Sequence, residues 1–179
     1  MVTGVFVLFD ALAKIRHLSW RVGPVGDGPA RHDLEEKALA LGLAGRDLFK
    51  GQVEREHLNR FYRDAGLLVF PSLAPESWGL VGTEAMFFGL PVIGFDVGAA
   101  HEWLAHGETG LLVQASDVDR LADALATLLG DAALLQRLGQ EASRRTPQFL
   151  GSQAEFAQRI ERVYLQAMAD WARGHEDRN

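Results

Sequence analysis

Short apolar runs that alternate with helix-like segments constrain the fold of this 179-residue chain more than any other feature. Two of the runs, 66–70 (GLLVF) and 91–95 (PVIGF), are bounded by glycine or proline, which is typical of strands buried on both faces of a sheet. The segment between them, about 79–88, has the pattern of a helix. Strands that alternate with helices in this way predict an α/β fold, with a parallel sheet covered by helices on both faces.

The rest of the chain continues this alternation. Further strands are expected at 20–25, 46–51 and 110–113, and further helices at about 4–17, from Pro29 to near Gly42, and at 54–65, 99–107, 116–145 (broken at Gly130) and 151–173. Ser116 or Asp117 is expected to cap the first helix of the broken pair, and Asp131 the second. We interpret residues 1–179 as a single domain with a C-terminal helix at 151–173 and a frayed tail at 174–179.

Composition excludes several classes of protein. The chain has no cysteine, so neither a disulfide framework nor a thiolate metal site is possible. Its net charge of -6 argues against a nucleic-acid-binding face, which would need a basic patch. No apolar run approaches the roughly 18 residues that suggest a membrane span. We expect a cytoplasmic protein that could also lie peripherally at a membrane.

Two glutamates in the segment 71–94 are the strongest candidates for a functional site. Glu76 lies in the loop that leaves the carboxyl end of strand 66–70, where ligands bind in parallel sheets, and Glu84 lies one turn inside the following helix. A carboxylate accepts hydrogen bonds from vicinal hydroxyls, such as those of a ribose or a hexose. The alternative is that both glutamates are solvated surface residues, as acidic residues usually are.

The start of the helix at 79–88 is suited to an anion. Ser77 is expected to cap it, and Gly79 would let the backbone approach a ligand closely. The first N–H groups of the helix, around Leu80 and Val81, have no partner within the helix and favour a phosphate group. A phosphate site beside two hydroxyl-binding carboxylates indicates a ligand with both phosphate and sugar.

This stretch also resembles a known family. The segment 71–113 is similar to the C-terminal, donor-binding domain of retaining glycosyltransferases of the GT-B fold (glycosyl transferases group 1, family 4-like). The matching positions are Pro71, Ser72, Glu76, Trp78-Gly79-Leu80, Glu84, Ala85-Met86 and Gly89-Leu90-Pro91-Val92. The segments GDGP (26–29), KGQV (50–53) and GETGLLV (107–113) are also typical of the family. The resemblance covers nearly the whole chain and implies a Rossmann-like, doubly wound parallel sheet.

The resemblance implies a role for each site residue. Glu76 would be the catalytic residue that contacts the donor sugar near the reacting centre, and Glu84 would accept hydrogen bonds from the ribose. The other donor-binding residues would be Trp78, Gly79, Leu80, Val81, Gln52, Val53 and Gly26. The substrate would be a UDP-, GDP- or ADP-sugar, whose sugar is transferred to an acceptor with retention of configuration, and neither a metal nor a cofactor would be needed.

The sequence departs from the family at its N-terminus. The family has one more strand before the first helix, and an arginine and a Lys-Gly pair that clamp the diphosphate; here Thr3-Gly4 replaces Lys-Gly and the arginine has no counterpart. We therefore expect a fragment that lacks this central strand and the N-terminal acceptor-binding domain. An alternative function is a nucleotide-sugar-binding or interaction module without turnover, which could self-associate through an exposed strand or the C-terminal helix.

The missing strand would leave a gap in the sheet. In a doubly wound sheet it would lie between the candidate strands 20–25 and 67–71, which would then each expose unpaired backbone groups. We expect these two strands to pair directly, or a neighbouring chain to fill the gap. If neither happens, the sheet would split.

Two other motifs carry little weight. HEWLAH places His101 and His106 five residues apart, whereas a helical zinc-binding pair needs a spacing of four. GDGPAR matches only part of a dinucleotide-binding fingerprint, because Arg31 stands at the third glycine position. We expect neither a metal site nor an NAD site.

Overall fold

The computed structural model describes residues 4–46, 49–149 and 153–176. The chain divides into two compact units, Met1–Thr146 and Pro147–Asn179. In the first unit the elements are α1 (Gly4–Lys14), α2 (Arg31–Ala40), α3 (Arg55–Asp64), β1 (Leu68–Phe70), α4 (Leu80–Phe87), β2 (Val92–Phe95), α5 (Ala100–Trp103), β3 (Gly110–Val113), α6 (Val118–Gly130) and α7 (Ala132–Arg145). A short 3-10 turn at Thr146–Gln148 follows α7 at the boundary, and the second unit contains α8 (Gln153–Glu176).

The described strands form one parallel sheet in the order β1-β2-β3. Leu68 pairs with Val92 and Phe70 with Gly94, and β2 in turn pairs residue by residue with β3 from Val92↔Gly110 onward. The central strand β2 is buried along its whole length, whereas β1 is only half-buried. The α/β class and the parallel sheet are therefore confirmed, but the prediction that strand 66–70 is buried on both faces is wrong because β1 lies at the edge of the sheet.

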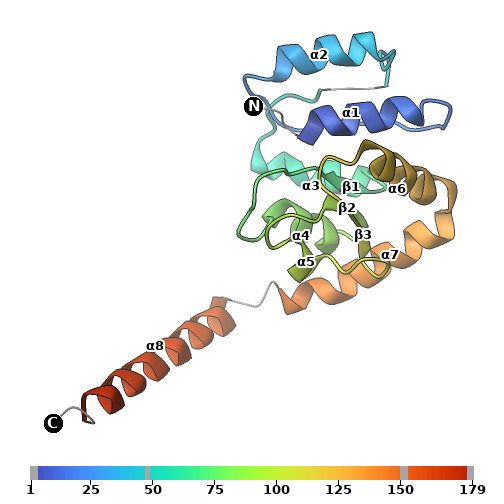
Figure 1. Ribbon diagram of the computed structural model, residues 1–179. Helices are drawn as coiled ribbons and strands as arrows, with labels where there is room; N and C mark the ends of the chain where they lie inside the picture. Colours follow the sequence, from blue (N-terminus) through green and yellow to red (C-terminus); the bar gives the residue numbers. More distant parts are fainter. Residues whose placement is uncertain (1–3, 47–48, 150–152, 177–179) are drawn as a thin grey trace. The chain divides into compact units, whose positions relative to one another are not determined.

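Helices cover both faces of the sheet. In Figure 1, α1 and α2 lie beyond one face, and α4 and α5 lie beyond the other. Apolar side chains of α1 and α6 pack together on the first face, with Phe9, Leu121 and Leu128 almost completely buried. The apolar spacing that predicted the first helix is thus the face that α1 turns toward the core, although the helix ends at Lys14 rather than near residue 17.

Segment 20–25 does not form a strand of the sheet, which corrects the expected pairing with 67–71. Within the described residues it runs beside the segment that leads to Gly51 instead. Val22 N–H donates to the Arg46 carbonyl at 3.1 Å, and Gly26 N–H donates to the Gly51 carbonyl at 2.9 Å. Only isolated bridges join Val25 and Gly26 to Gly51. The expected strand 46–51 is likewise reduced to these bridges, and its residues 47–48 lie outside the described part.

The two helices at 116–145 begin at aspartates. Asp117 accepts a hydrogen bond from Arg120 N–H at 2.9 Å, and Asp131 accepts one from Leu134 N–H at 2.9 Å. Asp117 rather than Ser116 is therefore the first cap, and the prediction for Asp131 is confirmed. Each side chain satisfies an N–H group that the first turn of a helix leaves without a partner.

We expect the Asp131→Ala variant to lower the free energy of unfolding by about 1 kcal/mol, because it removes the cap of α7. Urea denaturation followed by circular dichroism measures this change. The matched control is Asp131→Asn, which keeps an oxygen acceptor at the same place and should retain most of the stability. Equal losses in the two variants would show that the charge, and not the cap, matters.

The second unit is described by itself. α8 spans Gln153–Glu176, a longer helix than the expected 151–173, and it carries the first three residues of the expected tail 174–179. The last three residues lie outside the described part. The apolar stripe of α8 is exposed along its length, at Phe156, Ile160, Val163, Tyr164, Met168 and Trp171.

Candidate functional site

A cavity of about 870 Å³ lies beside β1. Its wall comes from α1, α3, α4, α6, β1 and the extended segment 20–26. The residues of the predicted site that line it are Gly26, Gln52, Val53, Val81 and Glu84. Segments far apart in the sequence, around residues 26, 52 and 84, therefore meet at one cavity.

Glu84 is held in place by α3. Tyr62 donates a hydrogen bond from its hydroxyl to Glu84 Oε2 at 3.1 Å, and Arg55 Nη2 lies 3.6 Å from Glu84 Oε1. The Tyr62 ring stacks on Phe88, with 5.2 Å between the ring centroids. The Glu84 side chain is 35% exposed, so its carboxylate can still reach a ligand in the cavity. Sequence reasoning missed Tyr62 and Arg55, because nothing local in α3 indicates a partner 22 or more residues away.

Burial raises the pKa of Tyr62 to about 12, and the charge of Glu84 and its hydrogen bond raise it further in the same direction. The folded protein therefore keeps this proton at a pH where an unfolded chain has lost it. The contribution of Tyr62 to stability is complete below the ordinary tyrosine pKa of about 10, and it is lost as the pH rises toward about 12.

We expect a spectrophotometric titration to place the ionisation of Tyr62 near pH 12. The chain has two tyrosines, so the Tyr164→Phe background leaves Tyr62 as the single titrating phenol. In that background, Glu84→Gln should shift the midpoint downward, because it removes the negative charge next to the phenol. An unchanged midpoint would show that the two side chains are not in contact.

The N-terminus of α4 lies next to Glu84 in the sequence. Gly79 is the N-cap residue, with a φ of 92°, and no side chain caps the helix. The prediction that Ser77 is the cap is therefore wrong. Gly79 is required here because its φ is unfavourable for other residues, and because a Cβ would lie 3.1 Å from the buried Trp103 ring. The N–H groups of Leu80 and Val81 precede the first turn's hydrogen bond, which Gly82 N–H makes to the Gly79 carbonyl.

Glu76 lies outside the cavity wall. It is exposed in the loop 71–79 and accepts a hydrogen bond from the Ser72 hydroxyl at 2.7 Å. Trp78, Gly79 and Leu80 do not line the cavity either. Glu76 is nevertheless on the same rim, because its loop joins the carboxyl end of β1 to the N-terminus of α4.

Basic side chains border the cavity as well. Arg21 and Lys50 belong to its wall, and the Lys50 chain packs over Gly23. The sequence analysis assigned no cation to the site, since it sought the family's Lys-Gly pair at Thr3-Gly4, where Thr3 lies outside the described residues. Lys50 precedes the Gly51-Gln52 turn, so the segment typical of the family did contain this signal.

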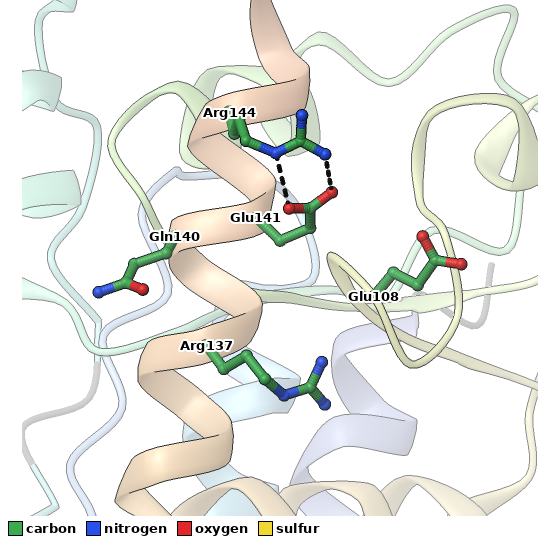
Figure 2. A pocket seen from close by; sticks show the side chains of 5 residues that line it. All are labelled: Glu108, Arg137, Gln140, Glu141 and Arg144. Atoms are coloured by element: carbon green, nitrogen blue, oxygen red, sulfur yellow. Dashed lines mark hydrogen bonds and ion pairs between the residues drawn. The ribbon is translucent and has the colours of Figure 1, made fainter.

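A second pocket, of about 450 Å³, lies between α7 and the loop before β3 and is lined by Glu108, Arg137, Gln140, Glu141 and Arg144. Figure 2 shows the Arg144 guanidinium making two bonds to the Glu141 carboxylate, at 2.8 and 2.6 Å. Arg145 also donates to Glu141 and to Glu108. The hydrogen bonds from Arg144 and Arg145 lower the pKa of Glu141 to about 2. Both carboxylates are thus already paired, and this pocket is a surface ion-pair cluster.

The histidines of HEWLAH have structural neighbours. His106 Nδ1 accepts a hydrogen bond from Leu112 N–H at 3.1 Å, and His101 Nδ1 lies 3.8 Å from Asp96. Across the described ranges, no group of three or more His, Cys, Asp or Glu side chains is placed to hold a metal ion. In the same part of the chain, no helix combines the length and apolar character needed to cross a membrane.

Comparison with known proteins agrees with this architecture. The family model for glycosyl transferases group 1 matches residues 2–145. A D-inositol 3-phosphate glycosyltransferase of Nocardia farcinica is 43% identical over 121 residues, which are 67% of this chain and 27% of that protein. The chain spans between 14% and 35% of the length of the curated relatives that it matches.

Two solved structures share the fold. Sucrose-phosphate synthase from Thermosynechococcus elongatus superposes with a TM-score of 0.81 and 32% identity, over 94% of this chain and 43% of that one. Anabaena Alr3699/HepE, crystallised in complex with UDP and glucose, superposes with a TM-score of 0.77 and 27% identity, over 88% of this chain and 44% of that one. With a parallel sheet, a glutamate-bearing helix start and a family match over most of its length, the chain belongs to the glycosyl transferases group 1 family and forms a glycosyltransferase domain of the GT-B type.

Proposed function

We propose that this domain binds the nucleotide-sugar donor of a retaining glycosyltransferase, with UDP as the first nucleotide to test. The observation that carries the proposal is that Glu84, Val81, Gly26, Gln52 and Val53 line one cavity. A carboxylate that is held by Tyr62 but still partly exposed is suited to accept hydrogen bonds from the two hydroxyls of a ribose. The complex of Anabaena HepE with UDP and glucose supports the choice of nucleotide.

The diphosphate would lie at the N-terminus of α4. The N–H groups of Leu80 and Val81 and the positive end of the helix dipole favour an anion there. Lys50, in the wall of the same cavity, would add a positive charge. These groups would stabilise the charge that develops on the departing diphosphate, so no metal need be invoked for that step.

In the proposed reaction the bond between the anomeric carbon and the diphosphate oxygen breaks, and the acceptor oxygen bonds to the same face of that carbon. The acceptor proton is released, and the nucleotide diphosphate leaves as the second product. Glu76, at the carboxyl end of β1, would contact the hydroxyls of the donor sugar. The acceptor would be bound by a separate N-terminal domain, since the chain covers a minor part of each relative's length.

Saturation-transfer NMR on the 179-residue chain tests the binding step. UDP, GDP, ADP and their glucose conjugates are compared at millimolar concentration, and we expect the ribose protons of UDP to be saturated. The affinity should be high micromolar or weaker, because each lost charged hydrogen bond of the family's clamp costs about 1.5–3 kcal/mol, or roughly 10–100-fold. The absence of transfer to any of the nucleotides would overturn the proposal.

A binding module without turnover is the second candidate. The half-buried edge of β1, next to an open cavity, is the observation that favours it, because a donor site bounded by an incomplete sheet is poorly fixed. Turnover distinguishes the two candidates: release of UDP from UDP-glucose, in water or with added acceptors, indicates a transferase, whereas binding with no release at any enzyme concentration indicates the module.

A further inference from the structure

The two edges of the sheet are treated differently by the chain. At the β3 edge, Leu112 N–H donates to His106 Nδ1, and the Gly110 carbonyl accepts from Gly107 N–H at 2.8 Å. The turn at 105–107 therefore closes this edge. The β1 edge has no such cover among the described residues, because β2 is the one strand that pairs with β1.

The direction of the free backbone groups on β1 follows from one hydrogen bond. Leu68 N–H donates to the Pro91 carbonyl of the β2 side at 3.0 Å. In a parallel ladder the N–H and C=O of one residue point to one neighbour, and those of the next residue point to the other side. The backbone groups of Leu67 and Val69 therefore face away from β2, toward the cavity. Both residues belong to the cavity wall.

The cavity beside this edge is predominantly apolar. Its wall includes Leu8 and Leu12 of α1, Leu58 and Phe61 of α3, and Leu125 and Leu128 of α6. The extended segment 20–26 forms another part of the wall, and its own hydrogen bonds run to 46–51 and not to β1. The cavity thus combines a row of backbone donors and acceptors with apolar side chains from several helices.

We propose that this groove, defined by Leu67, Val69 and the six apolar side chains named above, receives an extended apolar strand of another polypeptide, which pairs in parallel with β1. Small apolar molecules would leave the backbone groups of Leu67 and Val69 without partners, whereas a strand satisfies both. A strand inserted in a parallel sheet is covered by helices on both faces. The occupant should therefore be a continuous run of about five Val, Ile or Leu residues, and not an alternating polar and apolar sequence.

The proposal does not depend on the donor-binding function. The groups assigned to the nucleotide, Glu84, Gln52 and Gly26, form one part of the cavity wall, and the strand would lie along β1. An unpaired strand edge invites pairing with another chain, and proteins usually shield it with charge, proline or a covering segment. Here Pro71 follows the strand and no charged residue lies within 65–70, apart from the Asp64 that ends α3.

A synthetic peptide tests the proposal on the intact chain. The probe has a central Val-Ile-Val-Ile-Val run, flanked by lysines for solubility and labelled with fluorescein, and fluorescence anisotropy measures its binding. The matched control has the same sequence with N-methyl groups on the alternate residues that would donate to β1. We expect saturable binding of the probe and at least tenfold weaker binding of the control. Equal binding of both peptides, or no binding of either, would overturn the proposal.

Hydrogen exchange provides a position-specific readout. With the probe bound, the amides of Leu67 and Val69 should exchange at least tenfold more slowly, while that of Leu68, already bonded to the β2 side, should change little. The Val69→Pro variant removes the N–H that faces the groove and spares the ladder to β2, so it should weaken binding at least tenfold. If this variant does not fold, the N-methylated peptide and the exchange pattern still decide. Uniform protection of Leu67, Leu68 and Val69 would contradict strand pairing.

Discussion

Replacing Trp103 with alanine should lower the free energy of unfolding by about 3–5 kcal/mol, the cost typical of removing a large buried aromatic side chain. Trp103 ends α5 and is 2% exposed. Its ring contacts Phe70 of β1 edge-on, with 5.8 Å between the ring centroids. On its other side it touches α4 so closely that a Cβ on Gly82 would fall 2.1 Å from the ring.

The same ring supports the candidate site. Gly79, at the start of α4, packs on Trp103 and Phe70. Loss of the indole would leave a cavity beneath the helix start, and it would loosen the N–H groups of Leu80 and Val81. The indole N–H has no hydrogen-bond partner among the described residues, so the truncation breaks no hydrogen bond, and the cost comes from packing alone.

Urea denaturation monitored by circular dichroism measures the effect. The matched control is Leu39→Ala on α2, whose side chain is 68% exposed and whose loss should change the free energy of unfolding by less than about 0.5 kcal/mol. A loss below about 1 kcal/mol in Trp103→Ala would mean that the α4–α5 packing described above does not form in solution.

Local patterns predicted the elements of this fold well. The apolar runs that became β1, β2 and β3 are bounded by glycine or proline, and the aspartates at 117 and 131 are caps that act within one turn of helix. Both signals are complete within a few residues of sequence. The failures arose where the outcome depends on a distant partner.

Segment 20–25 illustrates such a failure. Its composition suits a strand, but whether it joins the sheet depends on which backbone groups lie next to it. Those groups belong to 46–51, and not to β1. The expected burial of strand 66–70 failed for the same reason, since a strand becomes central only when a neighbour covers its second edge.

The site shows the same division. Periodicity placed Glu84 on a helix, but it could not show that Tyr62 holds the carboxylate or that Gly26 and Gln52 line the same cavity. In HEWLAH the histidines attracted a metal hypothesis, whereas the residue of greatest structural weight is Trp103 between them. Its contacts with Gly79 and Gly82 depend on how α5 packs against α4, which no local pattern encodes.

Glu84→Gln should weaken UDP binding by about 10–100-fold, because a hydrogen bond to a charged acceptor contributes roughly 1.5–3 kcal/mol. Glutamine keeps the size of the side chain and offers an amide oxygen to Tyr62, so the fold around α3 and α4 should be preserved. The side chain is partly exposed, which favours the lower part of this range because solvent weakens the interaction. NMR chemical-shift titration with UDP measures the dissociation constant in the expected high micromolar to millimolar range.

Glu76→Gln is the matched control, since it makes the same chemical change eight residues earlier on the same rim. Glu76 lies outside the cavity wall and is assigned to the sugar, so its loss should leave UDP binding unchanged and weaken UDP-glucose binding. Glu84→Gln should weaken both ligands equally, because the ribose is common to them. The pair of variants thus separates the nucleotide end of the site from its sugar end. If Glu84→Gln binds UDP as tightly as the parent chain, the ribose is not held by this carboxylate, and the cavity beside β1 is not the nucleotide site.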